Sequence, residues 1–316
     1  MTRIALAYLA KAKYGGWPTF TRHLHAALAA AGAKPVIRTI GARTADMRHD
    51  FGHGLMARRM RAEDLLKSGM PILIAAADKD HAEQAAELVA KGAHIVVHDP
   101  AEKHLAGIPP ERTVVIRRSM QARLAGARFI PHPYERRNPQ RNPILPAIAH
   151  SRVDFDKYTH LILDAVDLGA DIRIFGAPNP MYVHFKIRPK WPDFKSEPFP
   201  RDAHAGADLC ATARTVIDMS AIKNDGGGSQ YAFLEAWDAR APLVINRKWV
   251  DGYDGDEMKH GFNCLAAADG AEIKACLDRL ASNRDLANHL VANAETTLAL
   301  HDPKAIGLQY RTVMGV

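Results

Sequence analysis

One glycine-rich run in the second half of the chain could bind a phosphorylated ligand. It comprises Gly226, Gly227, Gly228, Ser229, Gln230 and Tyr231. The run follows a predicted strand and precedes a predicted helix, so its backbone amides and the positive end of that helix could bind a diphosphate. Glu235 lies about one helical turn beyond Tyr231, where its carboxylate could accept hydrogen bonds from ribose hydroxyls. The alternative is a flexible loop followed by a surface glutamate.

Two cations precede this run at the start of the same half. Arg152 and Lys157 flank a predicted turn into a helix. A guanidinium and an ammonium directed at one place could neutralise the phosphates of one ligand. Each residue taken singly could be an ordinary surface charge, but a pair beside a glycine-rich helix start favours a phosphate site.

The first half contains two further features that could contribute to a ligand site. Gly15 and Gly16 follow the first predicted strand, and glycine there allows the backbone to approach an anion closely. The third glycine of a dinucleotide-binding fingerprint is missing, which disfavours a nicotinamide enzyme. His98 and Asp99 end another predicted strand, where open α/β sheets bind ligands, and the histidine could exchange a proton with a substrate hydroxyl. The alternatives are an ordinary turn and a structural histidine.

The sequence predicts neither a metal site nor a disulfide framework. The histidines match no zinc-ligand spacing, and the 3 cysteines are too few and too scattered. No apolar run approaches the ~20 residues of a membrane span, and we interpret the apolar Ile4–Ala10 as a strand rather than a signal peptide. We therefore expect a cytoplasmic protein.

The charge of the chain is unevenly distributed. The 316 residues carry 42 lysines and arginines against 35 aspartates and glutamates, a net charge of +7. Residues 1–150 hold 23 against 12, which gives +11, whereas residues 151–316 hold 19 against 23, which gives −4. A basic half could attract nucleic acid, an anionic membrane surface or a phosphorylated acceptor, or it could simply be a solvated surface.

Short apolar strands alternate with amphipathic helices in both halves, which is typical of parallel sheets covered by helices. The predicted strands are 4–9, 36–40, 72–76, 95–98, 113–116, 172–175, 215–219 and 242–245, and the predicted helices are 18–31, 81–91, 156–168, 230–239 and 272–280, with a mostly helical tail over 284–316. A proline-rich stretch over 131–150 reads as a linker. We predict an α/β protein of two Rossmann-like lobes with a cleft between them, residues 1–140 and 141–316, the second ending in the helical tail.

Together these features resemble the two-lobed GT-B glycosyltransferases, particularly the retaining family-4 type. The segments that carry the resemblance are the Gly15-Gly16 loop, Phe129–Pro133, Ser151–Tyr158 and Asp225–Ala236. The resemblance implies a nucleoside diphosphate sugar as donor, with a UDP-sugar as the first candidate, whose diphosphate Arg152 and Lys157 would bind and whose ribose Glu235 would bind. It further implies sugar transfer to a hydroxyl with retention, no required metal, and His98 or Asp99 engaging the acceptor or the transferred sugar.

The sequence departs from the family pattern at defined positions. Gly227 stands where the family has the first carboxylate of its donor segment, and Asp225 is near enough in sequence to substitute for it. Ser151 and Tyr158 stand where the family usually has glycines.

The layout also resembles bacteriophage DNA α-glucosyltransferases, through the strand ending in His98-Asp99 and the helix from Gln230 to Glu235. The first GT-B lobe usually holds the acceptor, so the basic half implies DNA with hydroxymethylated bases, in the host cytoplasm if the protein is phage-encoded. The candidate phosphate contacts are Lys11, Lys13, Arg58, Arg59, Arg61, Arg117 and Arg118, with Arg136 and Arg137 as an extension. Trp17 or Tyr14 could stack on a displaced base. The run 58–61 reads otherwise as a solvated helix face.

Other functions remain open. The acceptor could be a lipid, a lipopolysaccharide or a small molecule, or the chain could be a non-catalytic nucleic-acid-binding relative. A dinucleotide-dependent oxidoreductase or epimerase is disfavoured by the incomplete glycine pattern.

Overall fold

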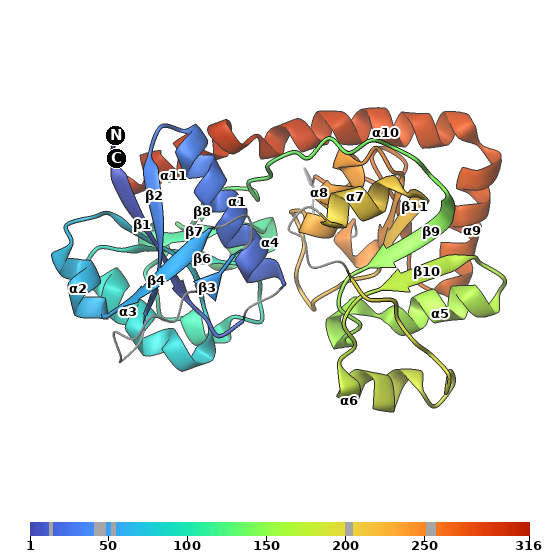
Figure 1. Cartoon of the computed structure of the whole chain (residues 1–316), viewed down its shortest axis with the longest axis horizontal. Helices are drawn as coiled ribbons and strands as arrows, with labels where there is room; N and C mark the ends of the chain where they lie inside the picture. Colours follow the sequence, from blue (N-terminus) through green and yellow to red (C-terminus); the bar gives the residue numbers. More distant parts are fainter. Residues whose placement is uncertain (13–14, 41–48, 52–54, 200–204, 251–256) are drawn as a thin grey trace. The chain divides into compact units, whose positions relative to one another are not determined.

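The computed structural model describes the chain except for residues 13–14, 41–48, 52–54, 200–204 and 251–256. It divides into two compact units, of which unit 1 comprises Met1–Glu135 with His301–Val316 and unit 2 comprises Arg136–Leu300. Each unit is built on one β-sheet with helices packed against it (Figure 1). The predicted α/β class is therefore confirmed.

The sheet of unit 1 has the strand order β3-β4-β2-β1-β5-β6-β7-β8. Its strands are β1 (Arg3–Leu9), β2 (Lys34–Ile40), β3 (His49–Asp50), β4 (Met56–Met60), β5 (Ile72–Ala77), β6 (His94–Val97), β7 (Thr113–Val115) and β8 (Arg128–Phe129). Only the pairing of β3 with β4 is antiparallel among the described strand pairs. The two central strands, β1 and β5, are almost completely buried, as expected for a parallel sheet covered on both faces.

The helices of unit 1 are α1 (Gly16–Ala30), α2 (Ala62–Lys67), α3 (Ala82–Ala90), α4 (Arg118–Arg123) and α11 (Pro303–Met314). The apolar side chains of α1 that fall at helical spacing, including Phe20, Leu24 and Leu28, are fully buried. Gly15 precedes α1 with φ 98°, a left-handed conformation that glycine adopts without steric cost.

The predicted helix face at residues 58–61 is wrong, because Met56–Met60 forms strand β4. It pairs in parallel with β2, and Arg38 lies opposite Arg58. Ala57 is buried while Met56 and Arg58 are exposed, which is the alternation of a half-covered strand. The run of charges concealed this alternation in the sequence.

The sheet of unit 2 is entirely parallel, with the strand order β10-β9-β11-β12-β13. Its strands are β9 (Leu145–His150), β10 (Ile172–Phe175), β11 (Ala213–Asp218), β12 (Leu243–Asn246) and β13 (Leu265–Ala267). Its helices are α5 (Thr159–Asp167), α6 (Pro180–Tyr182), α7 (Ala205–Ala211), α8 (Tyr231–Asp238), α9 (Gly270–Ser282) and α10 (Arg284–Leu298). No helix in the described part of the chain is long and apolar enough to cross a membrane.

The predicted linker over 131–150 is wrong in its last part, because Leu145–His150 forms the inner strand β9. Pro146 suggested a break, since proline cannot donate to a strand ladder. It is exposed at the second position of β9, and pairing with β10 starts only at Ala147. The missing N–H therefore costs the sheet no hydrogen bond on that side.

The end of the chain differs from the predicted second lobe of residues 141–316. His301–Val316 belongs to unit 1, where α11 packs on α1. Nη1 of Arg311 donates to the carbonyl of Ala31 over 2.6 Å, and Ile306 and Tyr310 are fully buried. The apolar face of α11 therefore completes the core of unit 1.

Candidate functional site

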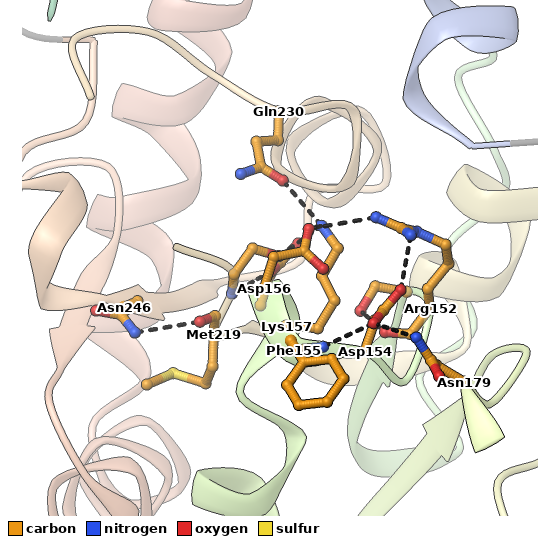
Figure 2. Close-up of polar contacts among 12 residues, drawn as sticks. Arg152, Asp154, Phe155, Asp156, Lys157, Asn179, Met219, Gln230 and Asn246 are labelled. Atoms are coloured by element: carbon orange, nitrogen blue, oxygen red, sulfur yellow. Dashed lines mark hydrogen bonds and ion pairs between the residues drawn. The ribbon is translucent and has the colours of Figure 1, made fainter. Parts of the chain in front are cut away.

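The candidate site of unit 2 lies at the carboxyl edge of its sheet. Strands β9, β11 and β12 end at His150, Asp218 and Asn246, and parallel strands bring their carboxyl ends to one edge. Open α/β sheets bind their ligands at this edge. Figure 2 shows the polar side chains that follow β9 and β11 there.

Arg152 is held by two carboxylates of its own loop. Its Nη1 lies 2.8 Å from Oδ2 of Asp154 and its Nη2 lies 3.3 Å from Oδ2 of Asp156 (Figure 2). Asp154 is fixed in turn, because its Oδ1 accepts from the backbone N–H of Phe155 and from Nδ2 of Asn179, each over 2.8 Å. The guanidinium remains about half exposed, with 54% of the side chain accessible, so it is available to a ligand.

Lys157 points into the same site from the turn before α5. Its Nζ donates to Oγ of Ser220 over 2.9 Å, lies 3.5 Å from Oε1 of Gln230, and lies 3.7 Å from Oδ2 of Asp156 (Figure 2). Arg152 and Lys157 therefore meet at one oxygen of Asp156. The two cations singled out by sequence come together in the structure.

Tyr158 has a backbone conformation that is uncommon for a residue other than glycine. It has φ 47° and ψ 36°, a left-handed conformation between the turn Phe155–Lys157 and α5. Glycine adopts this conformation without steric cost, which is why a glycine suits the position. Tyr158 adopts this less favourable conformation, and its ring centroid lies 4.8 Å from Nζ of Lys248.

Ser220 and Asp218 support Lys157, and sequence reasoning missed both. Oδ1 of Asp218 accepts from the backbone N–H of Ser220 over 2.7 Å and also contacts its hydroxyl. Oδ2 of Asp218 is buried with no hydrogen-bond partner in the described part of the chain. The carbonyl of Met219 accepts from Nδ2 of Asn246 over 3.1 Å, which fixes this loop to β12 (Figure 2). A polar Asp-x-Ser that begins at the last residue of a buried strand was the available signal.

The glycine-rich run has a backbone that requires glycine. Gly226 and Gly227 have φ 152° and 72°, and Asp225 accepts from the N–H of Gly226 over 3.0 Å. A side chain at position 227 would be strained in this left-handed conformation, so the local backbone suits the glycine that stands there. The hydroxyl of Ser229 is buried without a hydrogen-bond partner among the described residues. Gln230 is the N-cap residue of α8, and Tyr231 is the first residue of the helix.

Glu235 projects from α8 toward the end of β9. Its Oε2 lies 3.0 Å from Nε2 of His150, whose side chain is 1% exposed. Glu235 itself keeps 16% of its side chain exposed. Sequence reasoning missed His150, which stood inside the predicted linker.

In unit 1, His98 is buried directly after β6. Its Nε2 lies 2.8 Å from the carbonyl of Ala75, and its backbone N–H donates to Oε2 of Glu102 over 2.7 Å. Its ring packs edge-on against Phe20. Burial, together with the nearby charge of Arg117, lowers the pKa of His98 to about 4, although the contact with Ala75 opposes this shift. The imidazole is therefore neutral at pH 7.

Glu102 is a buried acid beside His98 that sequence reasoning did not single out. Burial, reinforced by the charge of Asp99, raises the pKa of Glu102 well above its ordinary value. Its Oε1 accepts from Nε1 of Trp17 over 3.0 Å. Trp17, considered above for base stacking, is thus tied into the polar cluster next to His98. Asp99 accepts from the N–H of Ala101.

The basic candidates of unit 1 have different surroundings. Arg58 and Arg118 are exposed, and the guanidinium of Arg118 lies 4.3 Å from the ring centroid of Phe129. Arg61 pairs with Asp64 over 2.9 Å and Lys11 with Asp80 over 2.6 Å. Arg59 is half-buried and Arg117 is buried. Nη1 of Arg117 donates to the carbonyl of Ile116 over 3.2 Å. Lys13 and Tyr14 lie outside the described residues.

Arg136 and Arg137 lie at the start of unit 2, and both are in ion pairs. Arg136 contacts Asp238 and Glu295, and Arg137 contacts Asp208. Among the described residues, no group of histidine, cysteine, aspartate and glutamate side chains could hold a metal ion.

No known family profile matches the sequence, and no curated protein sequence matches it. Solved structures do match it in fold. Anabaena HepE, in complex with UDP and glucose, has a TM-score of 0.74 at 13% identity over 100% of both chains. An α-glucosyltransferase in complex with UDP and a 13-mer DNA containing an HMU base has a TM-score of 0.68 at 11% identity over 99% of both chains. S. aureus TarM, in a complex that includes UDP, has a TM-score of 0.58 at 11% identity over 78% of this chain and 55% of TarM. The chain therefore has the GT-B fold that the sequence predicted.

Proposed function

We propose that the chain is a glycosyltransferase that moves a sugar from a UDP-sugar to a hydroxyl group with retention. The observation that carries the proposal is the meeting of Arg152 and Lys157 at Oδ2 of Asp156, at the carboxyl edge of the unit 2 sheet. A diphosphate that displaces Asp156 gains both cations and the N-terminal amides of α8. UDP is present in the HepE, α-glucosyltransferase and TarM structures that share the fold.

The roles follow from the chemistry of each group. Arg152 and Lys157 offset the charge that develops on the leaving diphosphate, and the amides of Gly226, Gly227 and Gly228 assist. Glu235 binds the ribose hydroxyls, and Gly15 and Gly16 stay candidates for a close backbone approach to an anion. Fixed cations and amides supply the stabilisation that a metal gives in other transferases, so the proposal requires no metal.

His98 and Asp99 are assigned to the acceptor hydroxyl or the transferred sugar. Because Nε2 of His98 contacts a carbonyl, this nitrogen carries the proton in the neutral ring and Nδ1 keeps its lone pair. The histidine therefore acts as a hydrogen-bond acceptor rather than as a charged acid.

Titration calorimetry with UDP, together with hydrolysis of UDP-glucose, tests the donor assignment. We expect Arg152→Ala and Lys157→Ala each to weaken UDP binding by roughly tenfold or more, since each removes a charge-assisted contact to phosphate. Lys274→Ala is the matched control, because Lys274 pairs with Asp278 on its own helix α9. Unchanged UDP binding in both site variants, or no UDP binding by the wild type, would overturn the assignment.

We further propose that the acceptor is DNA containing hydroxymethylated bases. Unit 1 holds 22 lysines and arginines against 13 aspartates and glutamates, a net +9, whereas unit 2 holds 20 against 22, a net −2. Arg58 is exposed opposite Arg38 and makes no ion pair in the described part of the chain. Unpaired cations are suited to phosphate contact, because no carboxylate must be displaced first.

Sugar transfer from labelled UDP-glucose to hydroxymethylated DNA, to unmodified DNA and to lipid extracts tests the acceptor. We expect product only with hydroxymethylated DNA, and DNA affinity that falls steeply with salt. Arg58→Ala should reduce the salt slope by about 1, whereas Arg279→Ala in unit 2 should not change it. Transfer to a lipid or a small molecule would contradict the DNA proposal, and DNA binding without any transfer would favour a non-catalytic relative.

A further inference from the structure

The buried His150 forms an ion pair with the partly exposed Glu235, which is the proposed ribose contact. Nε2 of His150 lies 3.0 Å from Oε2 of Glu235. Oε1 of Glu235 makes no hydrogen bond to any described residue, and the side chain keeps 16% of its surface exposed. One oxygen is thus held by the protein while the other is left for a ligand.

Helix α7 packs closely against the same carboxylate at Gly206. A Cβ on Gly206 would lie 2.3 Å from Oε2 and 2.4 Å from Oε1 of Glu235. Real Cβ atoms do not approach so closely, so only glycine leaves the carboxylate in its place. Cys210, one turn further along α7, lies 3.5 Å from Nε2 of His150. The histidine and Gly206 together fix where the carboxylate lies.

We propose that His150 is a positioning residue that holds Oε2 of Glu235, so that Oε1 faces the ribose hydroxyls of the donor. This proposal rests on the proposed function, since it requires a nucleotide donor. The partner chemistry is a vicinal diol, which a carboxylate oxygen binds by accepting its O–H groups. The histidine acts only through the glutamate.

The electrostatics of the pair agree with this role. Burial alone would lower the pKa of His150, but the contacts with Cys210 and Glu235 raise it well above its ordinary value. Burial raises the pKa of the Cys210 thiol, while His150 and, to a smaller extent, Arg141 oppose this shift. A protonated imidazole keeps Glu235 ionised, and an ionised carboxylate is the stronger acceptor.

The test compares the affinity of UDP with that of 2′,3′-dideoxyuridine diphosphate in the full-length protein. The wild type should prefer UDP by roughly tenfold, the worth of one charge-assisted hydrogen bond. Glu235→Ala should abolish this preference. His150→Leu removes the donor and should lower the preference to within about twofold of Glu235→Ala, whereas His150→Gln keeps an N–H donor and should retain most of it.

Gly206→Ala keeps the test decisive if His150→Leu fails to fold. The three atoms nearest to the added Cβ all belong to the flexible end of Glu235, so we expect the helix to survive while the carboxylate moves and the preference falls. His289→Leu on α10 is the control and should keep the full preference. The proposal is overturned if folded His150→Leu retains the preference that Glu235→Ala loses, if Gly206→Ala retains it where His150→Leu does not fold, or if the wild type binds both diphosphates equally. Such results leave the donor assignment intact, because that assignment fails only if UDP does not bind or if Arg152 and Lys157 do not contribute.

Discussion

The backbone of α11 at Gly307 passes so close to α1 that a Cβ on this glycine would lie 2.1 Å from the carbonyl oxygen of Ala27. The same Cβ would lie 2.8 Å from Cβ of Ala31. Both neighbours are fixed by the backbone of α1, so neither can move aside. The end of the chain therefore belongs to unit 1 through a helix contact that only glycine permits.

We expect Gly307→Ala to destabilise unit 1 by about 2–3 kcal/mol, because overpacking a rigid contact forces the helices apart. This loss should appear although alanine is the better helix former by up to ~1 kcal/mol. Hydrogen exchange of the β1 amides measures the stability of unit 1 separately. Gly107→Ala, whose added Cβ would meet nothing within 4 Å, should change it by less than ~0.5 kcal/mol. If Gly307→Ala left the stability of unit 1 unchanged, α11 would not be anchored at this contact.

The sequence allowed the prediction of elements whose signal is local. Uninterrupted apolar runs identified β1, β5 and β12, and the helical spacing of apolar residues identified α1. The elements that were missed depend on partners distant in sequence. Strand β9 contains Pro146, whose missing N–H is harmless because pairing with β10 begins only at the next residue. Strand β4 contains arginines, and only its pairing with β2 makes their side chains alternate between the two faces of the sheet.

The residues of the candidate site also fall into those that local sequence patterns predicted and those that depend on distant partners. Arg152 and Lys157 were predicted because they lie close together in the chain beside a turn. Ser220, which holds Lys157, and His150, which holds Glu235, lie 63 and 85 positions from their partners. Such contacts are set by strand order, which no local pattern contains. The position of α11 on unit 1 has the same cause.

The contribution of His98 to the stability of unit 1 should fall as the pH drops from about 6.5 to about 4. The folded protein holds the pKa of His98 at about 4, below its ordinary 6.5, chiefly through burial. Within this window the unfolded chain binds a proton that the folded chain does not, so acid favours unfolding. The contribution of His98 is present above the unfolded pKa and is lost progressively below it, up to about 3 kcal/mol. Hydrogen exchange of the β6 amides at several pH values measures this slope.

His98→Gln should reduce the loss of unit 1 stability that acid causes, because glutamine does not titrate but can still donate to the carbonyl of Ala75. The buried His132, whose pKa is also lowered by burial, adds a slope of the same sign, and the buried Glu102, whose pKa is raised, adds one of the opposite sign. Both remain in the variant, so the difference between the wild type and His98→Gln reports His98. His184→Gln, a change at an exposed histidine of unit 2, should leave the slope unchanged. A slope in His98→Gln as steep as in the wild type would mean that His98 is charged in the folded protein.

Asp156→Asn should bind UDP more tightly than the wild type. Oδ2 of Asp156 lies near both Arg152 and Lys157, so a diphosphate must compete with it for the two cations. Removing the charge should increase UDP affinity by roughly two- to fivefold at low salt, a gain of about 0.5–1 kcal/mol that fades at high salt. Titration calorimetry at two salt concentrations measures both effects. Asp278→Asn, at a carboxylate paired with Lys274, should bind UDP like the wild type, and weaker binding by Asp156→Asn would show that Asp156 orients the cations for the ligand.

Arg136→Ala should destabilise unit 2 by about 2–3 kcal/mol, because it leaves a buried carboxylate without its cation. The side chain of Asp238 is fully buried, and Nε of Arg136 lies 3.2 Å from its Oδ1. Arg136 also forms two hydrogen bonds to Glu295, of 2.5 and 3.0 Å. Arg137 pairs with Asp208 at 3.4 Å with both side chains about half exposed, so Arg137→Ala should cost less than ~1 kcal/mol. Hydrogen exchange of the α8 amides measures both losses.

The ion pair can be separated from the backbone contacts that share Asp238. Its carboxylate also accepts from the N–H groups of Arg137 and Asn138, over 2.7 and 3.2 Å, and Asn138 has the left-handed φ of 48°. Asp238→Asn keeps an acceptor for these amides but removes the charge, so it should cost less than Asp238→Ala. Combining Asp238→Asn with Arg136→Ala should then cost less than the sum of the two single changes, because both remove the same ion pair. If the losses simply add, Arg136 stabilises unit 2 through Glu295 alone, and its guanidinium could leave Asp238 to contact a phosphate at little cost.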